Sequence, residues 1–332
     1  MAEPTSALTF QDLIITVARK AGTAYYGAGG DEAAQAPTDT FDLAEAKTFV
    51  NDGIRMLISD APPDGWRWAR PVASVDMWPD VAVDATVTAT GVYTTVTTIT
   101  ATEATFYPSM EGKTIIVTGV GSYTIVSYTS STVITIAGDN AFAGKTFSIA
   151  NDGAYTLPQT FGGQYRGDIQ YAAETGVSVS PTWTAESYIR ALRAESTVQT
   201  DTPYLFAVRK MSLARRWELV VYPEASGLET VEFPYDLHFD ELSGLTDMHP
   251  AGYAFDEAVK AACLAVWERD GDDVIAGLND YYQNKALPNA FKINARSAPQ
   301  RLGYCGNPSR SNRTLRNFRN FQNRPTVTYD TP

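Results

Sequence analysis

Two segments near the start of the chain repeat apolar residues at a spacing of three and four, the pattern of a helix with one buried face. The first spans residues 9–21 and the second residues 42–59. Thr9 and Asp12 match a capping box at the start of the first, and Pro62 ends the second. The apolar faces that we expect to be buried contain Phe10, Leu13, Val17, Phe49, Ile54 and Leu57.

The same spacing returns near the end of the chain. Residues 250–269 predict a third helix, with Pro250 in its first turn and a buried face that contains Phe255, Val259 and Val266. Cys263 lies on that face and is therefore expected in the core. Residues 273–286 predict a fourth helix, which Pro288 ends.

The pattern between these helices is that of strands. Residues 84–150 are rich in Thr, Val, Ile and Ser, and alternate in short runs between turn residues, which predicts a small all-β module. Residues 151–248 mix strand runs such as Trp217–Tyr222 with a short helix near 185–194.

These elements predict an α+β fold. The N- and C-terminal helices would form a helical bundle, with a β-rich middle domain, an inserted small all-β module and an extended C-terminal arm. The expected divisions are 1–80 and 249–290 for the two halves of the helical domain, 81–150 for the inserted module, 151–248 for the β-rich domain and 291–332 for the arm.

Charge is distributed unevenly along the chain. The formal net charge is −12, yet residues 291–332 hold eight Lys or Arg and one Asp, so residues 1–290 carry −19. An acidic body with a cationic, aromatic-containing end is typical of an assembly component whose arm contacts a partner. The residues that we expect to dock are Arg301, Arg310, Arg313, Arg316, Phe318, Arg319, Phe321, Arg324 and Tyr329.

Candidate reaction centres are weak. His238, Asp240 and His249 contain the types used in metal or acid–base sites, but both histidines are read as loop residues. The glycine-rich stretch 26–30 lacks the Lys-Ser/Thr of a phosphate loop, and Asp270, Asp272 and Asp273 lack calcium-loop spacing. We therefore expect no catalytic activity, no cofactor and no metal. No run of eighteen apolar residues occurs, so no membrane partner is expected either.

The sequence resembles the head-to-tail adaptor (connector) proteins of tailed bacteriophages. The residues that carry the resemblance are the helical stretch 46–57, the Pro62, Pro63, Trp66 and Trp68 group, the strand end 155–161, the strands at 202–204 and 219–223, and the stretches 258–268 and 281–287. The run 106–115 is similar to small β modules of phage tail and neck proteins.

The resemblance implies a structural virion protein in the neck between head and tail, present in the host cytoplasm during assembly. Copies would form a ring, usually of twelve, that docks through the arm onto the portal protein and offers a surface to a tail or nozzle protein. Duplex DNA would pass through the channel without specific binding.

Two other functions remain open. A carbohydrate- or host-binding tail protein would act through the β module, with Tyr93, Phe106 and Tyr107 as its aromatic contacts. A nucleic-acid-binding protein would act through the basic arm, with Arg313, Arg316 and Arg319 on phosphates.

Overall fold

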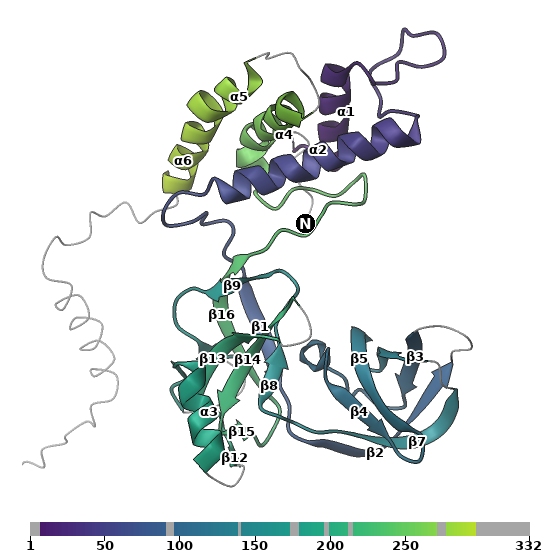
Figure 1. Ribbon diagram of the computed structural model, residues 1–332, viewed down its shortest axis with the longest axis vertical. Coiled ribbons are helices and arrows are strands. Elements are labelled where there is room, and N and C mark those ends of the chain that lie inside the picture. Colours follow the sequence, from purple (N-terminus) through teal and green to yellow (C-terminus); the bar gives the residue numbers. More distant parts are fainter. Residues whose placement is uncertain are drawn as a thin grey trace, which may run out of the picture.

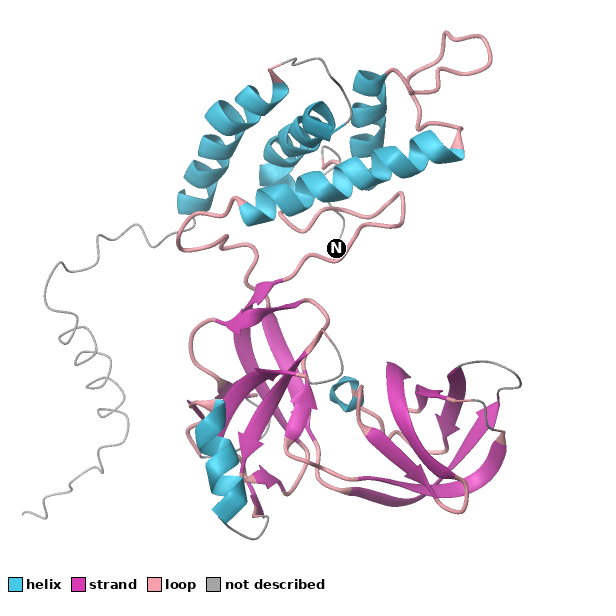
Figure 2. Cartoon of the chain, in the orientation of Figure 1, coloured by secondary structure: helices cyan, strands magenta, loops and turns pink. Residues whose placement is uncertain are grey.

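The computed structural model describes residues 7–90, 96–138, 141–172, 179–195, 199–211, 215–270 and 277–296. All the α-helices but one gather at one end of the molecule, a two-sheet unit lies beneath them, and a closed barrel extends to one side of that unit (Figure 1). Figure 2 shows that most of the regular structure is strand.

The expected fold class is wrong. The described chain is mainly β, with a closed six-stranded barrel and many further strands, and it is not a helical bundle formed by the N- and C-terminal helices. Apolar periodicity shows which face of a helix is buried but not what covers it, and the short strands between the helices make up more of the molecule than their sequence signal suggested.

The helical part has one apolar core. It contains α1 (Phe10–Ala21), α2 (Thr40–Ser59), α4 (Asp256–Asp270), α5 (Leu278–Tyr281), a π-helical turn (Tyr282–Ala286) and α6 (Leu287–Arg296). Thr9 and Asp12 do form a reciprocal capping box on α1. The backbones of α2 and α4 approach closely at Gly53, where an added Cβ would lie 2.5 Å from the Cα of Cys263.

The ends of the C-terminal helices differ from those expected. Helix α4 begins at Asp256 rather than 250, after Gly252 in a left-handed conformation (φ 74°). The last helix continues to Arg296, and Pro288 lies in the first turn of α6, where a missing N–H is tolerated. Asn294 is buried and its Oδ1 accepts the Arg67 N–H at 2.9 Å, so residues 291–296 belong to the folded body.

The two tryptophans after α2 pack back against the helices, as expected. Trp66 Nε1 donates to the Leu57 carbonyl at 2.9 Å. The Trp66 ring lies 5.8 Å from Phe255 and 5.5 Å from Phe291, measured between centroids. This aromatic group joins the end of α2, the 3₁₀ turn Tyr253–Phe255 that precedes α4, and α6.

The barrel contains the Thr-rich runs. Its strands are β2 (Val81–Thr90), β3 (Val96–Ala101), β4 (Thr114–Val117), β5 (Gly121–Ser130), β6 (Val133–Ala137) and β7 (Phe142–Ile149), in the closed order β2-β3-β6-β5-β4-β7. Alternation along β3 buries Ile99 and exposes Thr98 and Thr100. A short 3₁₀ turn, η1 (Pro108–Met110), follows β3 and lies against the two-sheet unit.

Two four-stranded sheets form the unit between the barrel and the helices. The first contains β1 (Val72–Met77), β16 (Glu229–Leu237), β10 (Gln170–Tyr171) and β9 (Phe161–Tyr165). The second contains β11 (Thr182–Trp183), β13 (Leu205–Lys210), β14 (Trp217–Tyr222) and β8 (Ala154–Thr156), with α3 (Glu186–Glu195) packed on β13 and β14. A small pair, β12 (Thr200–Asp201) and β15 (Glu224–Ala225), completes it.

The barrel and the two sheets share one apolar core. Within the described ranges, strands β1 and β8 each pair on one side only, so each is an edge strand. Among the described residues, no helix is both long and apolar enough to cross a bilayer.

Candidate functional site

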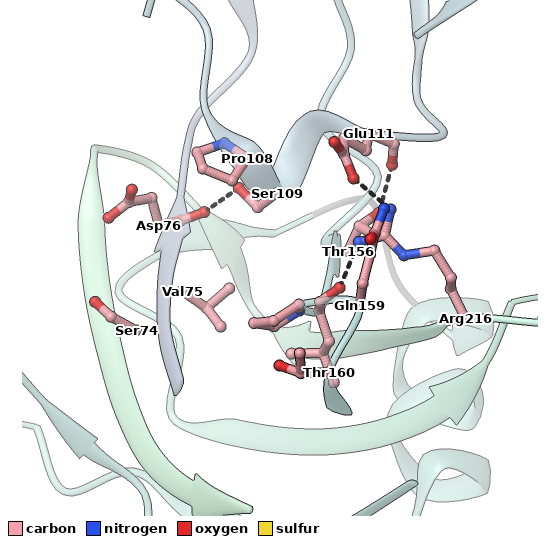
Figure 3. A pocket seen from close by; sticks show the side chains of 12 residues that line it. Ser74, Val75, Asp76, Pro108, Ser109, Glu111, Thr156, Gln159, Thr160 and Arg216 are labelled. Atoms are coloured by element: carbon pink, nitrogen blue, oxygen red, sulfur yellow. Dashed lines mark hydrogen bonds and ion pairs between the residues drawn. The ribbon is translucent and has the colours of Figure 1, made fainter. Parts of the chain in front are cut away.

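A cleft of about 340 Å³ lies where the barrel meets the two-sheet unit (Figure 3). Three segments line it: Ser74–Asp76 on edge strand β1, residues 108–111 of the barrel turn, and residues 156–160 at the end of edge strand β8, with Arg216 from the start of β14. Sheet edges carry backbone groups that no neighbouring strand uses, so a cleft between two of them is a natural binding surface.

Glu111 is the centre of the polar contacts at this cleft. Its carboxylate receives the Arg216 guanidinium through Oε2 and the Tyr128 N–H at 2.8 Å through Oε1, and its carbonyl accepts the Thr156 hydroxyl. Arg216 also donates to the Leu157 carbonyl at 2.8 Å. One barrel residue is therefore bonded to both β8 and β14, and Figure 3 shows Arg216 pointing toward it.

A second set of charges joins the barrel to the sheets nearby. The Lys113 side chain is only 8% exposed, and its Nζ lies 2.8 Å from Asp152 Oδ1 and 3.8 Å from Glu218 Oε2. Glu218, also nearly buried, holds Arg209 Nε at 2.6 Å. Since buried charges are stable only when paired, these contacts fix the barrel against β14.

The polar groups of the cleft bond to one another. Ser109 Oγ donates to the Asp76 carbonyl at 2.6 Å, and the Asp76 carboxylate accepts from Thr230 Oγ1 at 2.8 Å. Arg216 is neutralised by Glu111. Burial raises the pKa of the neighbouring Tyr107, and the Asp76 carboxylate adds to that rise.

No family model matches this chain. The search of curated proteins likewise finds no matching relative.

The histidine candidates are not brought together into a site. His249 is buried, and its Nε2 lies 2.8 Å from Asp256 Oδ1, while Asp256 Oδ2 accepts the Leu8 N–H at 3.0 Å. Burial lowers the pKa of His249, and Asp256 opposes part of that effect. His238 is exposed, and its backbone N–H donates to the Thr160 carbonyl. Among the residues described, no three His, Cys, Asp or Glu side chains are grouped to hold a metal.

The remaining candidates have structural surroundings. The glycine-rich stretch lies in the α1–α2 connection, where Tyr25 pairs with Gln35 in a short bridge and Gly27 turns the chain at φ 79°. Asp270 pairs with Arg269, while 272 and 273 lie outside the described residues. Cys263 is buried, which raises the pKa of its thiol to about 12.

The expected aromatic contacts of the β module are not displayed together. Phe106 is 1% exposed and packs on Phe147 in the barrel core, with ring centroids 5.6 Å apart. Tyr107 is half-buried, and Tyr93 lies outside the described residues. The arm residues Arg301, Arg310, Arg313, Arg316, Phe318, Arg319, Phe321, Arg324 and Tyr329 also lie outside them.

The helix residues singled out from the sequence lie in the core of the helical part. Phe10, Leu13, Val17, Ile54, Leu57, Phe255, Val259 and Val266 are buried, and Phe49 is partly buried. Sequence reasoning missed Lys113, Glu111 and Arg216. Glu218 offered the available signal, because a carboxylate inside the otherwise apolar run Trp217–Tyr222 requires a buried cation nearby.

Proposed function

We propose that this protein is a structural adaptor subunit of a tailed-phage neck, which associates with further copies and joins a portal ring to tail components. The observation that carries the proposal is the fixed attachment of the barrel, through Glu111 and Lys113, to the side of the two-sheet unit that lies beneath the helical part (Figure 1). A body of this kind would hold a contact surface on the barrel and another on the helical part at a fixed separation.

Charge supports the proposal. The segment after α6 contains six Arg and one Asp, which is +5, and leaves −17 on residues 1–296. Helix α6 ends at Arg296 in the helical part, so the cationic segment begins there. The acidic body repels the phosphates of a nucleic acid at close range. The charge distribution therefore favours a protein with acidic grooves as the partner of the cationic segment.

Exposed apolar side chains in the helical part support contact between copies. Phe41 is 75% exposed and Tyr253 is 63% exposed, while Tyr281 lies beside Glu257, to which its hydroxyl donates at 3.0 Å. Large aromatic side chains of this kind are enriched in protein interfaces.

Binding to portal rings of the same virus tests the proposal. We expect a chain ending at Arg296, and a full chain with Arg301, Arg310, Arg313, Arg316, Arg319 and Arg324 changed to Gln, to sediment with the rings at least about tenfold more weakly than the natural chain, since charge-assisted contacts are lost. The matched chain with six Lys instead keeps the charge, so we expect it to bind the rings more tightly than the Gln variant.

Equal binding by the natural chain and the Gln variant would refute the docking role of these arginines. Duplex DNA replaces portal rings in a parallel measurement at physiological salt. DNA binding that the Gln changes abolish, without any ring binding, would favour the nucleic-acid alternative.

A further inference from the structure

The free edge of β1 opens into the cleft. The Tyr235 N–H donates to the Pro71 carbonyl and the Leu237 N–H to the Ala69 carbonyl. These two bonds show which residues of β1 direct their backbone groups toward β16. The odd residues Ala73, Val75 and Met77 therefore bond to β16, while the backbone groups of Val72, Ser74 and Asp76 point the other way. Among the described residues, no backbone group bonds to Ser74 on that side.

The opposite wall is also a sheet edge. Leu157 N–H donates to the Trp217 carbonyl and Val221 N–H to the Gly153 carbonyl, so the backbone groups of Thr156 point away from β14. The two edges meet at one end, where the Tyr155 hydroxyl donates to the Trp78 carbonyl and the rings lie 5.7 Å apart. Ser109 caps the Asp76 carbonyl, and the cleft lies beside Ser74.

The two faces of an added strand would meet different surroundings. On the inner side, the cleft offers the buried Val75 and the ring of Pro108 (Figure 3), and Pro158 also lines it. On the outer side, the β1 residues Ser74 and Asp76 lie across from Glu232 and Thr230 of β16, and Glu232 is exposed. The cleft therefore suits a strand whose residues are apolar on one face and polar or cationic on the other.

We propose that the chain's own residues 324–329 occupy this cleft as a strand added to the edge of β1. In the run Arg-Pro-Thr-Val-Thr-Tyr, Val327 and Tyr329 share one parity, and Arg324, Thr326 and Thr328 share the other. Val327 and Tyr329 would face the apolar inner side of the cleft. Arg324 would then lie on the outer side, where Asp76 and Glu232 are.

The proposed strand is joined to the body by a long tether. Residues 297–323 span at most about 90 Å when fully extended, counted from the end of α6. A tethered segment binds its own body at an effective concentration in the millimolar range when the tether reaches, which favours its own cleft over that of another copy.

The inference goes beyond the proposed function, because it concerns the chain before any partner is present. A segment seated beside β1 is held on its own body, and a portal ring has to compete for it. Loss of ring binding and loss of this closure are measured separately, so either can fail alone.

Amide exchange in the full-length protein tests the closure. We expect the Ser74 amide to exchange at least tenfold faster in a variant with Val327→Pro and Thr328→Pro together than in the natural chain. The two changes remove a backbone N–H from each side of the added strand, so a ladder donor is lost whichever way the strand runs. The Ala73, Val75 and Met77 amides, which bond to β16, serve as internal references, and Gln322→Pro is the matched control. Equal Ser74 exchange in all three chains overturns the proposal.

A disulfide trap identifies the donor. In a Cys305→Ser background, Ser74→Cys is combined with Thr326→Cys or Thr328→Cys, both of the parity that faces Ser74. We expect a cross-linked species that runs as a single chain for at least one pair. The control replaces Ser74→Cys by Val126→Cys, an exposed barrel position (47%). Cross-linked dimers, or no more cross-linking at Ser74 than at Val126, overturn the assignment to the chain's own segment.

Discussion

The Lys113 side chain leaves the barrel and ends between two carboxylates of the neighbouring sheet. It is nearly buried, and so is Glu218, one of its two partners. A buried cation without partners is strongly unfavourable, and the same holds for the carboxylate that it leaves behind. Substituting Lys113 therefore lowers the free energy of unfolding mainly by leaving the buried Glu218 carboxylate short of a cation, and less by removing the contact itself.

We expect Lys113→Met to lower the free energy of unfolding by about 3 kcal/mol, because Glu218 keeps its burial and loses one of its cations. Urea denaturation measures the change. Lys145→Met, at an exposed lysine of the same barrel, is the control and should change stability by no more than about 0.5 kcal/mol. Similar small effects from both variants would show that the Lys113 pairing is not stabilising.

His249 predicts a pH dependence of stability. Burial lowers the pKa of His249 in the folded state. At pH values between this lowered pKa and the pKa of about 6.5 in the unfolded chain, the unfolded chain therefore binds the proton in preference to the folded one. Stability from this group is present above about pH 6.5 and is lost as the pH falls below it. We expect the urea midpoint to fall less between pH 8.0 and 5.5 in His249→Gln than in the natural chain.

His238→Gln is the control for that measurement, since His238 is the other histidine and is exposed. It should show the same pH response as the natural chain. A His249→Gln variant with an unchanged response would mean that His249 does not account for the effect.

At the scale of elements, the contact between α2 and α4 depends on the absence of a side chain. A Cβ at Gly53 would lie 2.5 Å from the Cα and 2.6 Å from the N of Cys263, and both are backbone atoms that cannot turn aside. We expect Gly53→Ala to lower the free energy of unfolding by about 2 kcal/mol, although alanine is the better helix former.

Thermal denaturation measures this change. Gly227→Ala is the matched control, because no atom lies within 4 Å of its added Cβ. An unchanged or higher melting temperature for Gly53→Ala would show that the two helices separate readily.

Individual elements were more predictable than their assembly. Periodicity identified α1 and α2, and β-branched alternation identified the runs that became β14 and the barrel strands, because these patterns reflect burial of single faces. The sequence pattern placed the end of the last helix before Pro288, although α6 continues to Arg296. A proline in the first turn of a helix and a proline that ends a helix look alike in sequence.

The cleft was not predictable, for a different reason. Ser74 and Thr156 are 82 positions apart, and their backbone groups meet at one opening only because β1 and β8 are edges of different sheets. Edge position is a property of sheet order, which no local pattern encodes. Glu111 and Arg216 are 105 positions apart in sequence and were missed for the same reason.

For the whole molecule, the junction at Glu111 sets the angle between the barrel and the sheets. We expect Glu111→Ala to raise the radius of gyration measured by small-angle X-ray scattering, because Arg216 and the Tyr128 N–H lose their common acceptor and the junction loosens. Glu103→Ala, at an exposed barrel residue, is the control. Identical scattering from both variants would show that the shared apolar core alone holds the angle.

The chain enters and leaves the barrel at a single place, since Val81 at the start of β2 pairs with Ile149 at the end of β7. A genetic cassette inserted between two adjacent positions would acquire such a barrel without rerouting the remainder of the polypeptide. Any barrel substituted there would need equivalents of Glu111 and Lys113, because Arg216 and Glu218 of the sheet unit would otherwise lose those partners.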